Sequence, residues 1–350
     1  MPQFLRTTPA RLGYAMPAEW EPHEATWLSW PHKEESWPGL FDAIPYVWAE
    51  IVRALVPFEE VRILVADEDM EHHARQVLAK ARVSVDQVRF FHIPTDDAWI
   101  RDHGPTFLLN RMERRLLVVD WEYNAWGGKY APWDSDNAVP QRIAEALDLP
   151  VAQPGMVLEG GSIDVNGRGT VLTTESCLLN PNRNPNLTRE QIEQKLCEYL
   201  GVRHVLWLGQ GIIGDDTDGH IDDLARFVAP RRVVAAVSED RSSPDYAALA
   251  DNFERLRRSR DQDGQPLEII PLPMPEPIFH QGQQLPASYA NFYIGNATVL
   301  VPTFGVPQDR QALALFEKLF PDRRVVGILC RDLIWGLGAI HCVTQQQPRC

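Results

Sequence analysis

One cysteine, one histidine and three carboxylates lie inside short polar motifs that are spread along the chain. Asp102 lies in WIRDHGP, Glu159 in LEGG, His220 and Asp222 in TDGHIDD, and Cys342 in GAIHCVTQQ. A thiol with a pKa of ~8.5 is only slightly ionised at neutral pH, so a reactive thiol needs a neighbouring histidine or cation. These residue types therefore indicate nucleophilic catalysis by Cys342, with His220 as the proton carrier.

Paired carboxylates add a preference for a planar cation. A guanidinium group presents its N–H donors in a fork, which a carboxylate accepts in bidentate fashion. Asp102 and Asp222 can bind such a group, whose charge would help to stabilise the Cys342 thiolate. After attack on the central carbon, His220 would protonate the departing ammonia and then activate water. Glu159 would orient His220 and favour its protonated form.

Further residues are candidates for substrate binding, and they are Trp99, Asn291, Asp96 and Asp218. Trp99 lies three residues before Asp102, and Asn291 opens another unit of the repeat described below. Capping or loop packing is the plain alternative for Asp96. The stretch around Asp218 fails the template of a calcium-binding loop, because its first position is glycine and its twelfth is Ala225.

The elements that must position these residues form a repeated pattern. Alternation of short β-rich runs with amphipathic stretches predicts strand-strand-helix-strand units at residues 26–67, 104–155, 162–211, 223–273 and 289–330. A period of ~45–75 residues is typical of an array or propeller. The last segment, 338–346, would supply a strand that closes a ring against the first unit. We therefore expect a pseudo-symmetric five-bladed α/β propeller.

The unit at residues 162–211 shows the pattern most clearly. Asn166-Gly167 predicts a tight turn between two antiparallel strands. The following helix should begin after Thr188, which is a good N-cap, and stop at Gly201.

Each candidate residue stands at the start of a unit, with gaps of 57, 61, 71 and 51 residues from Asp102 through Glu159, His220 and Asn291 to Cys342. If these starts are strands, alternate side chains share a face. His220 and Asp222 would then point the same way. The side chains of Asp223, Arg101 and His341 should point away from the site, because each is next in sequence to a candidate residue. We expect Asp223 to be a solvent or scaffold residue and His341 to be a hydrogen-bonded structural histidine.

Composition limits the classes of function. The chain has 350 residues and a formal net charge of −14, which argues against nucleic acid as a partner. A negative field would attract a cationic substrate, but the charge alone is explained more simply as a surface that keeps the protein in solution. We find no signal peptide and no apolar run that could span a bilayer, so we expect a cytoplasmic protein without a membrane partner. Five cysteines without a C-x-x-C pair argue against a disulfide framework and a structural zinc site.

Five motifs in order resemble the agmatine deiminase family, also called the bacterial-type peptidylarginine deiminase family. They are MPAEWEPHEATWLSWP, WIRDHGP, LEGGSIDVNG, GDDTDGHIDDLARF and GAIHCVTQQQP, and the resemblance covers residues 14–347. It implies the pentein fold of the guanidine-modifying superfamily, a single catalytic domain over residues 1–350, and no metal or organic cofactor. It also implies Cys342 as nucleophile, His220 as general acid and base, and Asp102 and Asp222 as guanidinium ligands.

The resemblance also matches Glu159 to the acid that assists the histidine, and Asn291 to a position near the site. We expect hydrolysis of agmatine to N-carbamoylputrescine and ammonia through a thiouronium on cysteine, a step towards putrescine. Another guanidine, such as arginine or peptidylarginine, is the alternative, because this chain reads GLGAIHC where family members usually read GGGNIHC. Acyl transfer fits less well because anionic clamps do not stabilise an oxyanion, and a non-catalytic propeller would not need Cys342. A homodimer is kept open.

Overall fold

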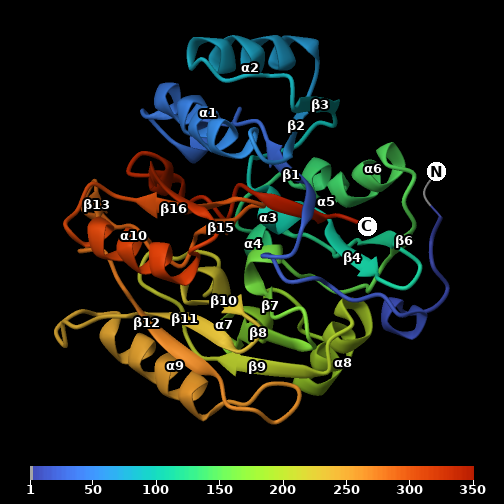
Figure 1. Cartoon of the computed structure of the whole chain (residues 1–350), viewed down its shortest axis with the longest axis vertical. Coiled ribbons are helices and arrows are strands. Elements are labelled where there is room, and N and C mark those ends of the chain that lie inside the picture. Colours follow the sequence, from blue (N-terminus) through green and yellow to red (C-terminus); the bar gives the residue numbers. More distant parts are fainter. Residues whose placement is uncertain (1–2) are drawn as a thin grey trace.

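A computed structural model describes residues 3–350 and is built around five small sheets that share one pattern (Figure 1). In each sheet an antiparallel pair of strands is followed by a strand parallel to the second. Four sheets contain β4 (Thr106–Asn110), β5 (Arg115–Val119) and β6 (Val151–Ala152); β7 (Asp164–Val165), β8 (Thr170–Thr174) and β9 (His204–Leu208); β10 (Ala225–Ala229), β11 (Arg232–Val237) and β12 (Glu268–Pro273); and β15 (Tyr293–Ile294), β16 (Thr298–Thr303) and β17 (Arg324–Leu329).

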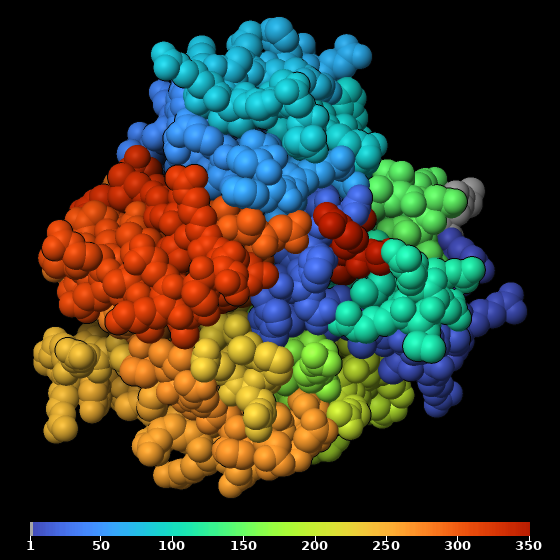
Figure 2. Space-filling model, in the orientation of Figure 1, coloured from blue at the N-terminus to red at the C-terminus, as the bar shows by residue number. Residues whose placement is uncertain are grey.

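The remaining sheet joins the two ends of the chain. Its order is β18 (Gln345–Pro348), β1 (His23–Ser29), β2 (Glu60–Val65) and β3 (Val88–His92), with β18 antiparallel to β1. The prediction that the last segment pairs with the first unit is therefore confirmed. Figure 2 shows the dark blue N-terminal segment and the dark red C-terminal residues side by side near the middle of one face. The strand β3 and the helix α2 (Glu68–Lys80) before it were not predicted.

Each sheet carries a helix on its outer side (Figure 1). These helices are α1 (Ile44–Leu55), α6 (Val139–Ala146), α8 (Arg189–Leu200), α9 (Tyr246–Arg258) and α10 (Gln308–Leu319). The boundaries of α8 follow from local chemistry, as predicted. The Thr188 hydroxyl accepts the N–H of Gln191, whose side chain bonds back to Thr188, and Gly201 takes the left-handed conformation at the C-cap.

Shorter elements connect these units. They are η1 (Pro9–Leu12), η2 (Glu34–Ser36), η3 (Phe41–Ala43), α3 (Ile100–His103), α4 (Ala125–Gly128), α5 (Asp134–Asn137), η4 (Gly160–Ser162), α7 (Glu175–Leu178), η5 (Ile221–Asp223), β13 (Phe279–His280), β14 (Gln283–Gln284) and η6 (Leu333–Gly336). Within residues 3–350 every helix falls short of the length and hydrophobicity that a membrane crossing requires. All five cysteines are free thiols.

The candidate residues do not lie on strands, so the strand argument for their orientation is wrong. Asp102 lies in α3 and Asp222 in η5, and Cys342 lies in the turn before β18. Each of these turns leads directly into the first strand of a sheet pair. The units do place the candidates at equivalent points, but a helical turn rather than β alternation sets the direction of each side chain.

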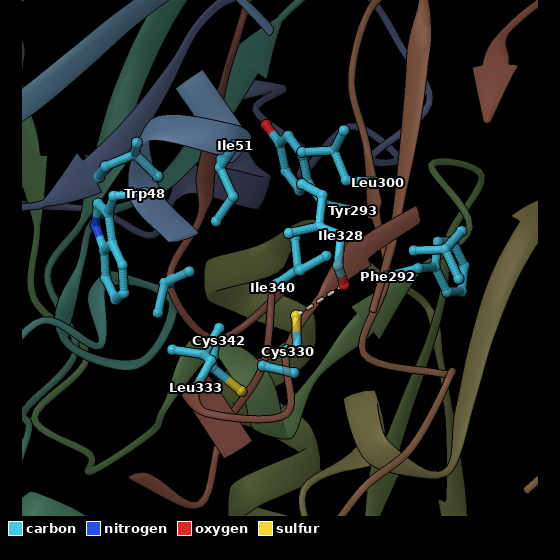
Figure 3. Packing of buried hydrophobic residues seen from close by; sticks show 14 of the residues in the cluster. Trp48, Ile51, Phe292, Tyr293, Leu300, Ile328, Cys330, Leu333, Ile340 and Cys342 are labelled. Atoms are coloured by element: carbon cyan, nitrogen blue, oxygen red, sulfur yellow. Dashed lines mark hydrogen bonds between the residues drawn. The ribbon is translucent and has the colours of Figure 1, made fainter. Parts of the chain in front are cut away.

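The largest apolar cluster lies under the turn that carries Cys342. It joins residues of α1, β16, β17 and η6, including Trp48, Leu300, Ile328 and Leu333 (Figure 3). Cys342 is at its edge and is 6 % exposed. The nucleophile candidate is therefore held by packing from elements more than 280 residues apart in sequence.

Candidate active site

Three of the predicted side chains converge on Gly161. A Cβ at this position would lie 2.6 Å from His220 Nδ1, 2.7 Å from Asp102 Oδ1 and 3.0 Å from Asp222 Oδ2. Gly161 has an ordinary backbone φ, so its role is close approach rather than conformational freedom. Gly161 thus lets side chains from two other units of the chain meet beside its backbone.

Asp102 is buried and held by two donors. Trp126 Nε1 donates to Oδ2 at 2.9 Å, and the backbone N–H of Gly161 donates to Oδ1 at 2.9 Å. Burial, and then the charge of Glu159, raise the pKa of Asp102 to about 7. A bound cation would reverse this balance, so the carboxylate is poised to ionise when a positive ligand arrives.

Asp222, the second carboxylate of the pair, lies close to Cys342 and His341. Its Oδ2 lies 3.9 Å from Cys342 Sγ and 2.6 Å from His341 Nδ1. Burial, and then the charge of Asp102, raise the pKa of Asp222 well above the usual range. Two buried carboxyl groups that repel each other would be stabilised in their ionised form by a bound cation.

Asn291 fixes the nucleophile rather than facing the cavity. Its Nδ2 donates to Cys342 Sγ at 3.1 Å and to Asp223 Oδ1 at 3.1 Å, while its Oδ1 accepts the backbone N–H of His341 at 3.0 Å. Asp223 is 5 % exposed, so its expected solvent position is wrong and only its scaffold role fits. The pKa of the Cys342 thiol is raised by burial and then by Asp222, Asp223 and Asp102.

His220 is a buried imidazole without a hydrogen-bond partner for either ring nitrogen within the described part of the chain. Its Nδ1 lies 3.6 Å from Asp102 Oδ1. Burial, and then Arg183, lower the pKa of His220 well below its usual value. Neither ring nitrogen is therefore engaged in another hydrogen bond within residues 3–350.

Glu159 lies close to His220 and also forms an ion pair with a buried arginine. Its Oε1 accepts Arg183 Nε at 2.6 Å, and both side chains are fully buried. The sequence reasoning missed Arg183, whose place in a loop shows no periodic or motif signal. Because Arg183 also lies near the imidazole, its charge lowers the pKa of His220.

Ligand atoms of Glu159, Cys177 and His220 lie within 4.8 Å of one another, which is close enough to share a metal ion. The buried guanidinium of Arg183 already pairs with Glu159 and would repel a second cation. The arrangement therefore fits proton transfer better than metal binding.

A cavity of about 220 Å³ opens onto Cys342. Among residues 3–350, the acids that line it are Glu35, Asp97, Asp102 and Asp216, and the one cation is Lys33. Lys33 Nζ lies 3.5 Å from Asp97 Oδ2, so its charge is already paired. Trp99, Trp126, Tyr130 and Trp335 add aromatic walls. The cavity thus suits an elongated cation with an apolar stem.

Trp99 lines this cavity and, with Trp37, leaves no room for side chains at the glycines of the GLG turn. A Cβ at Gly336 would lie 2.5 Å from Trp37 Nε1 and 2.9 Å from the Trp99 ring, and a Cβ at Gly338 would lie 2.5 Å from the Trp99 ring. Leu337 between them, also a lining residue, has φ +69°, the left-handed region that costs a non-glycine residue energy.

Besides Asn291, two further predicted binding residues lie outside the cavity. Asp96 Oδ2 accepts the backbone N–H groups of Ser135 and Asp136 at 2.7 and 3.3 Å, so Asp96 caps a short helix. Asp218 accepts Arg183 Nη1 at 2.7 Å and Lys129 Nζ at 3.0 Å. Both acids satisfy local donors, which replaces the predicted substrate contact with a supporting role.

Comparisons with known proteins agree with this geometry. Residues 15–348 match the family described as Porphyromonas-type peptidyl-arginine deiminase. The agmatine deiminase of Ectopseudomonas mendocina is 40% identical over 370 residues, covering 98% of each chain. The solved agmatine deiminase of Enterococcus faecalis is 37% identical, with a TM-score of 0.93 and full coverage of both chains. The resemblance noted in the motifs thus extends over the whole fold.

Proposed function

Because the chain belongs to the Porphyromonas-type peptidyl-arginine deiminase family, we propose that it hydrolyses agmatine to N-carbamoylputrescine and ammonia. The observation that carries this proposal is the convergence of Asp102, Asp222 and His220 on Gly161, with Asp222 3.9 Å from the Cys342 thiol. Two carboxyl groups, a nucleophile and a proton carrier in one buried site match the needs of guanidinium hydrolysis.

Binding of the cation prepares the nucleophile. Asp102 and Asp222 accept guanidinium N–H groups, and the ligand's charge offsets the carboxylates that otherwise raise the pKa of Cys342. The thiol then gives its proton to His220, and the thiolate attacks the central carbon. Asn291 Nδ2, 3.1 Å from Sγ, holds the sulfur in place.

Proton transfer completes the first half of the reaction. His220 is neutral before binding, because burial and Arg183 lower its pKa, so it can take up a proton near the departing nitrogen. It gives this proton to the leaving amine, and ammonia departs from the tetrahedral adduct. The thiouronium on Cys342 remains, and His220 then takes a proton from the water that attacks it. Collapse releases the ureido product and restores the thiol.

The charges of the cavity support agmatine over arginine. An α-carboxylate on the tail would meet Glu35, Asp97 and Asp216, and no arginine lines the cavity within the described residues. A primary ammonium at the tail would instead be attracted to these acids. A peptide on both sides of the tail would also require a wider opening than a cavity of about 220 Å³ suggests.

We extend the proposal to the architecture and location. The five sheets would form the blades of a propeller, with the turns that carry Asp102, Asp222 and Cys342 facing its axis. The shared strand pattern and the β18–β1 pairing support this arrangement. Five free thiols fit a reducing compartment, which supports the cytoplasm.

The decisive experiment measures ammonia and ureido product from agmatine, with wild type beside Cys342→Ala. Cys330→Ala is the matched control, because Cys330 belongs to the same cluster but donates to the Ile328 carbonyl, away from the cavity (Figure 3). We expect turnover by wild type and Cys330→Ala only. Equal ammonia release by wild type and Cys342→Ala would refute the mechanism, and a higher kcat/KM for arginine or a blocked arginine peptide would refute only the substrate.

A further inference from the structure

Three buried side chains, Asp222, His341 and Glu19, form a hydrogen-bonded chain that lies outside the cavity. His341 Nδ1 lies 2.6 Å from Asp222 Oδ2, and His341 Nε2 lies 2.9 Å from Glu19 Oε2. Asp222, His341 and Glu19 are 0 %, 2 % and 6 % exposed, so solvent has little access to the hydrogen bonds between them. The imidazole therefore bridges a carboxyl group of the site to a carboxyl group of the N-terminal segment.

Counting protons shows what this bridge can do. Two hydrogen bonds between one imidazole and two carboxyl groups require two protons. Either His341 is an imidazolium that donates to two carboxylates, or a neutral His341 donates to Glu19 and accepts from a protonated Asp222. Both arrangements hold the same number of protons. They differ only in whether one proton sits on Asp222 Oδ2 or on His341 Nδ1.

The surroundings fix the charge at the Glu19 end. Arg226 Nη2 lies 2.9 Å and Arg101 Nη2 3.4 Å from Glu19 Oε2, and the backbone N–H of Ile294 donates to Oε1 at 2.8 Å. Burial opposes ionisation of Glu19, but the charges of Arg226 and Arg101 and the hydrogen bond from His341 outweigh it and hold the pKa of Glu19 well below the usual range. Glu19 is therefore a permanent anion next to His341.

The Asp222 end is the variable one. The groups with charges that act on it are Asp102, Asp215, Arg226 and Arg101, and Asp223 and Cys342 face the same space. Without a ligand, burial and Asp102 favour the protonated form of Asp222. A neutral His341 is favoured at the same time, by its burial and then by Arg101 and Arg226. A cation beside Asp222 would reverse the first of these preferences.

We propose that His341 is a positioning residue that receives the proton of Asp222 when a guanidinium ion binds. The O–H bond of Asp222 breaks and the Nδ1–H bond of His341 forms along the 2.6 Å contact, while Nε2–H keeps donating to Glu19. Asp222 becomes the anion that the ligand needs, and Glu19 balances the imidazolium. The inference rests on the proposed function only in taking a guanidinium as the ligand.

The transfer couples the charge of the site to the charge of the ligand. The guanidinium group of the substrate is a cation, whereas the ureido group of the product is neutral. When the product forms, the proton returns from His341 to Asp222, and the anion that held the substrate disappears. Release of the product is thereby favoured without a proton path to solvent.

Proton counting tests the proposal directly. Agmatine binding to Cys342→Ala is measured by calorimetry in buffers of different ionisation enthalpy, which gives the protons released per ligand. Adding His341→Gln keeps a donor but removes the acceptor of the proton. We expect about one additional proton released to the buffer by Cys342→Ala/His341→Gln relative to Cys342→Ala. Equal release by both proteins would overturn the proposal.

A second variant guards against misfolding. Glu19→Gln removes the charge that balances the imidazolium, so the KM for agmatine near pH 7 should rise about tenfold and recover as the pH increases. Glu59→Gln is the matched control, because Glu59 pairs with His23 at 3.3 Å in a buried site that does not contact Asp222. It should lower Tm and leave KM and its pH dependence unchanged.

The outcomes separate the two proposals. A pH-independent KM in Glu19→Gln, with a lowered Tm, would reduce the network to a structural role and overturn the inference. If Cys342→Ala bound guanidinium ion but the wild type did not turn over agmatine, the proposed function would be refuted. The proton count with guanidinium ion would then decide the role of His341 by itself. Failure of every guanidinium to bind would overturn both.

Discussion

Adding one methyl group at Gly161 should inactivate the protein more than it destabilises it. The ideal Cβ would lie 2.6, 2.7 and 3.0 Å from polar atoms of His220, Asp102 and Asp222, whereas ordinary contacts begin at 3.4 Å. The three groups would have to retreat by about 0.8, 0.7 and 0.4 Å, the differences from 3.4 Å. All three carry roles in the proposed chemistry, so none can move without changing the geometry around the ligand.

The magnitude follows from these displacements. A misplacement of ~1 Å in an active site costs about 10²-fold in rate, which corresponds to about 2.7 kcal/mol of transition-state stabilisation. Overpacking costs about 1–3 kcal/mol of folding free energy, and replacing glycine by alanine returns about 0.4–1 kcal/mol through the unfolded chain. Gly161→Ala should therefore lose about 100-fold in kcat/KM for agmatine and at most about 2–3 kcal/mol of stability.

The assay compares kcat/KM with the free energy of unfolding in urea, because guanidinium chloride would itself bind the site. Gly209→Ala is the control, since a Cβ there would meet Asp251 at 3.2 Å and Arg255 and Asn252 at 3.4 Å, and no group of the site. It should change both quantities little. If Gly161→Ala kept the kcat/KM of the wild type, this result would refute the convergence on which the proposed function rests.

Three further outcomes are expected. Arg183→Met should cost about 3–5 kcal/mol in urea, because it leaves Glu159 buried without its partner, and adding Glu159→Gln should restore most of that loss; an unchanged midpoint in the single variant would contradict the pairing. The pKa of Asp102 is about 7 in the folded protein and 3.8 ordinarily, so between pH 4 and 7 only the folded state holds this proton, and the free energy of unfolding falls as pH rises. The slope of this fall should be shallower in Asp102→Asn. Identical slopes in the two proteins would argue against the raised pKa. Leu337→Gly should be more stable than Leu337→Ala by about 1 kcal/mol, the reverse of the usual order, because residue 337 has φ +69°; thermal melts with alanine above glycine would contradict the left-handed assignment.

Local chemistry explains which parts of the fold were predictable. Thr188, Gln191 and Gly201 act within a few residues of one another, so the sequence specified both ends of α8. The Asn166-Gly167 turn and the alternation around it likewise predicted the pairing of β7 with β8. Repetition of this pattern predicted the α/β units, although β3 and α2 escaped because they extend only the first of them.

The candidate chemistry was predictable in kind but not in arrangement. Motif composition identified Cys342, His220, Asp102 and Asp222, and the structure brings their turns together. Strand alternation gave wrong reasons for their directions, because these residues lie on helical turns before the strands. The sequence predicted Asp96 and Asp218 as substrate-binding residues. In the structure, a backbone N–H group donates to Asp96 and a cationic side chain donates to Asp218.

By itself, then, the sequence determined which residue types are available and the local elements that carry them. Only the tertiary structure decided that Arg183 neutralises Glu159, that Asn291 holds the thiol, and that His341 joins Asp222 to Glu19. These partners are separated by 24, 51 and up to 322 residues. Side-chain hydrogen bonds act over about 3 Å, so no pattern along the chain reveals them until packing brings the partners together.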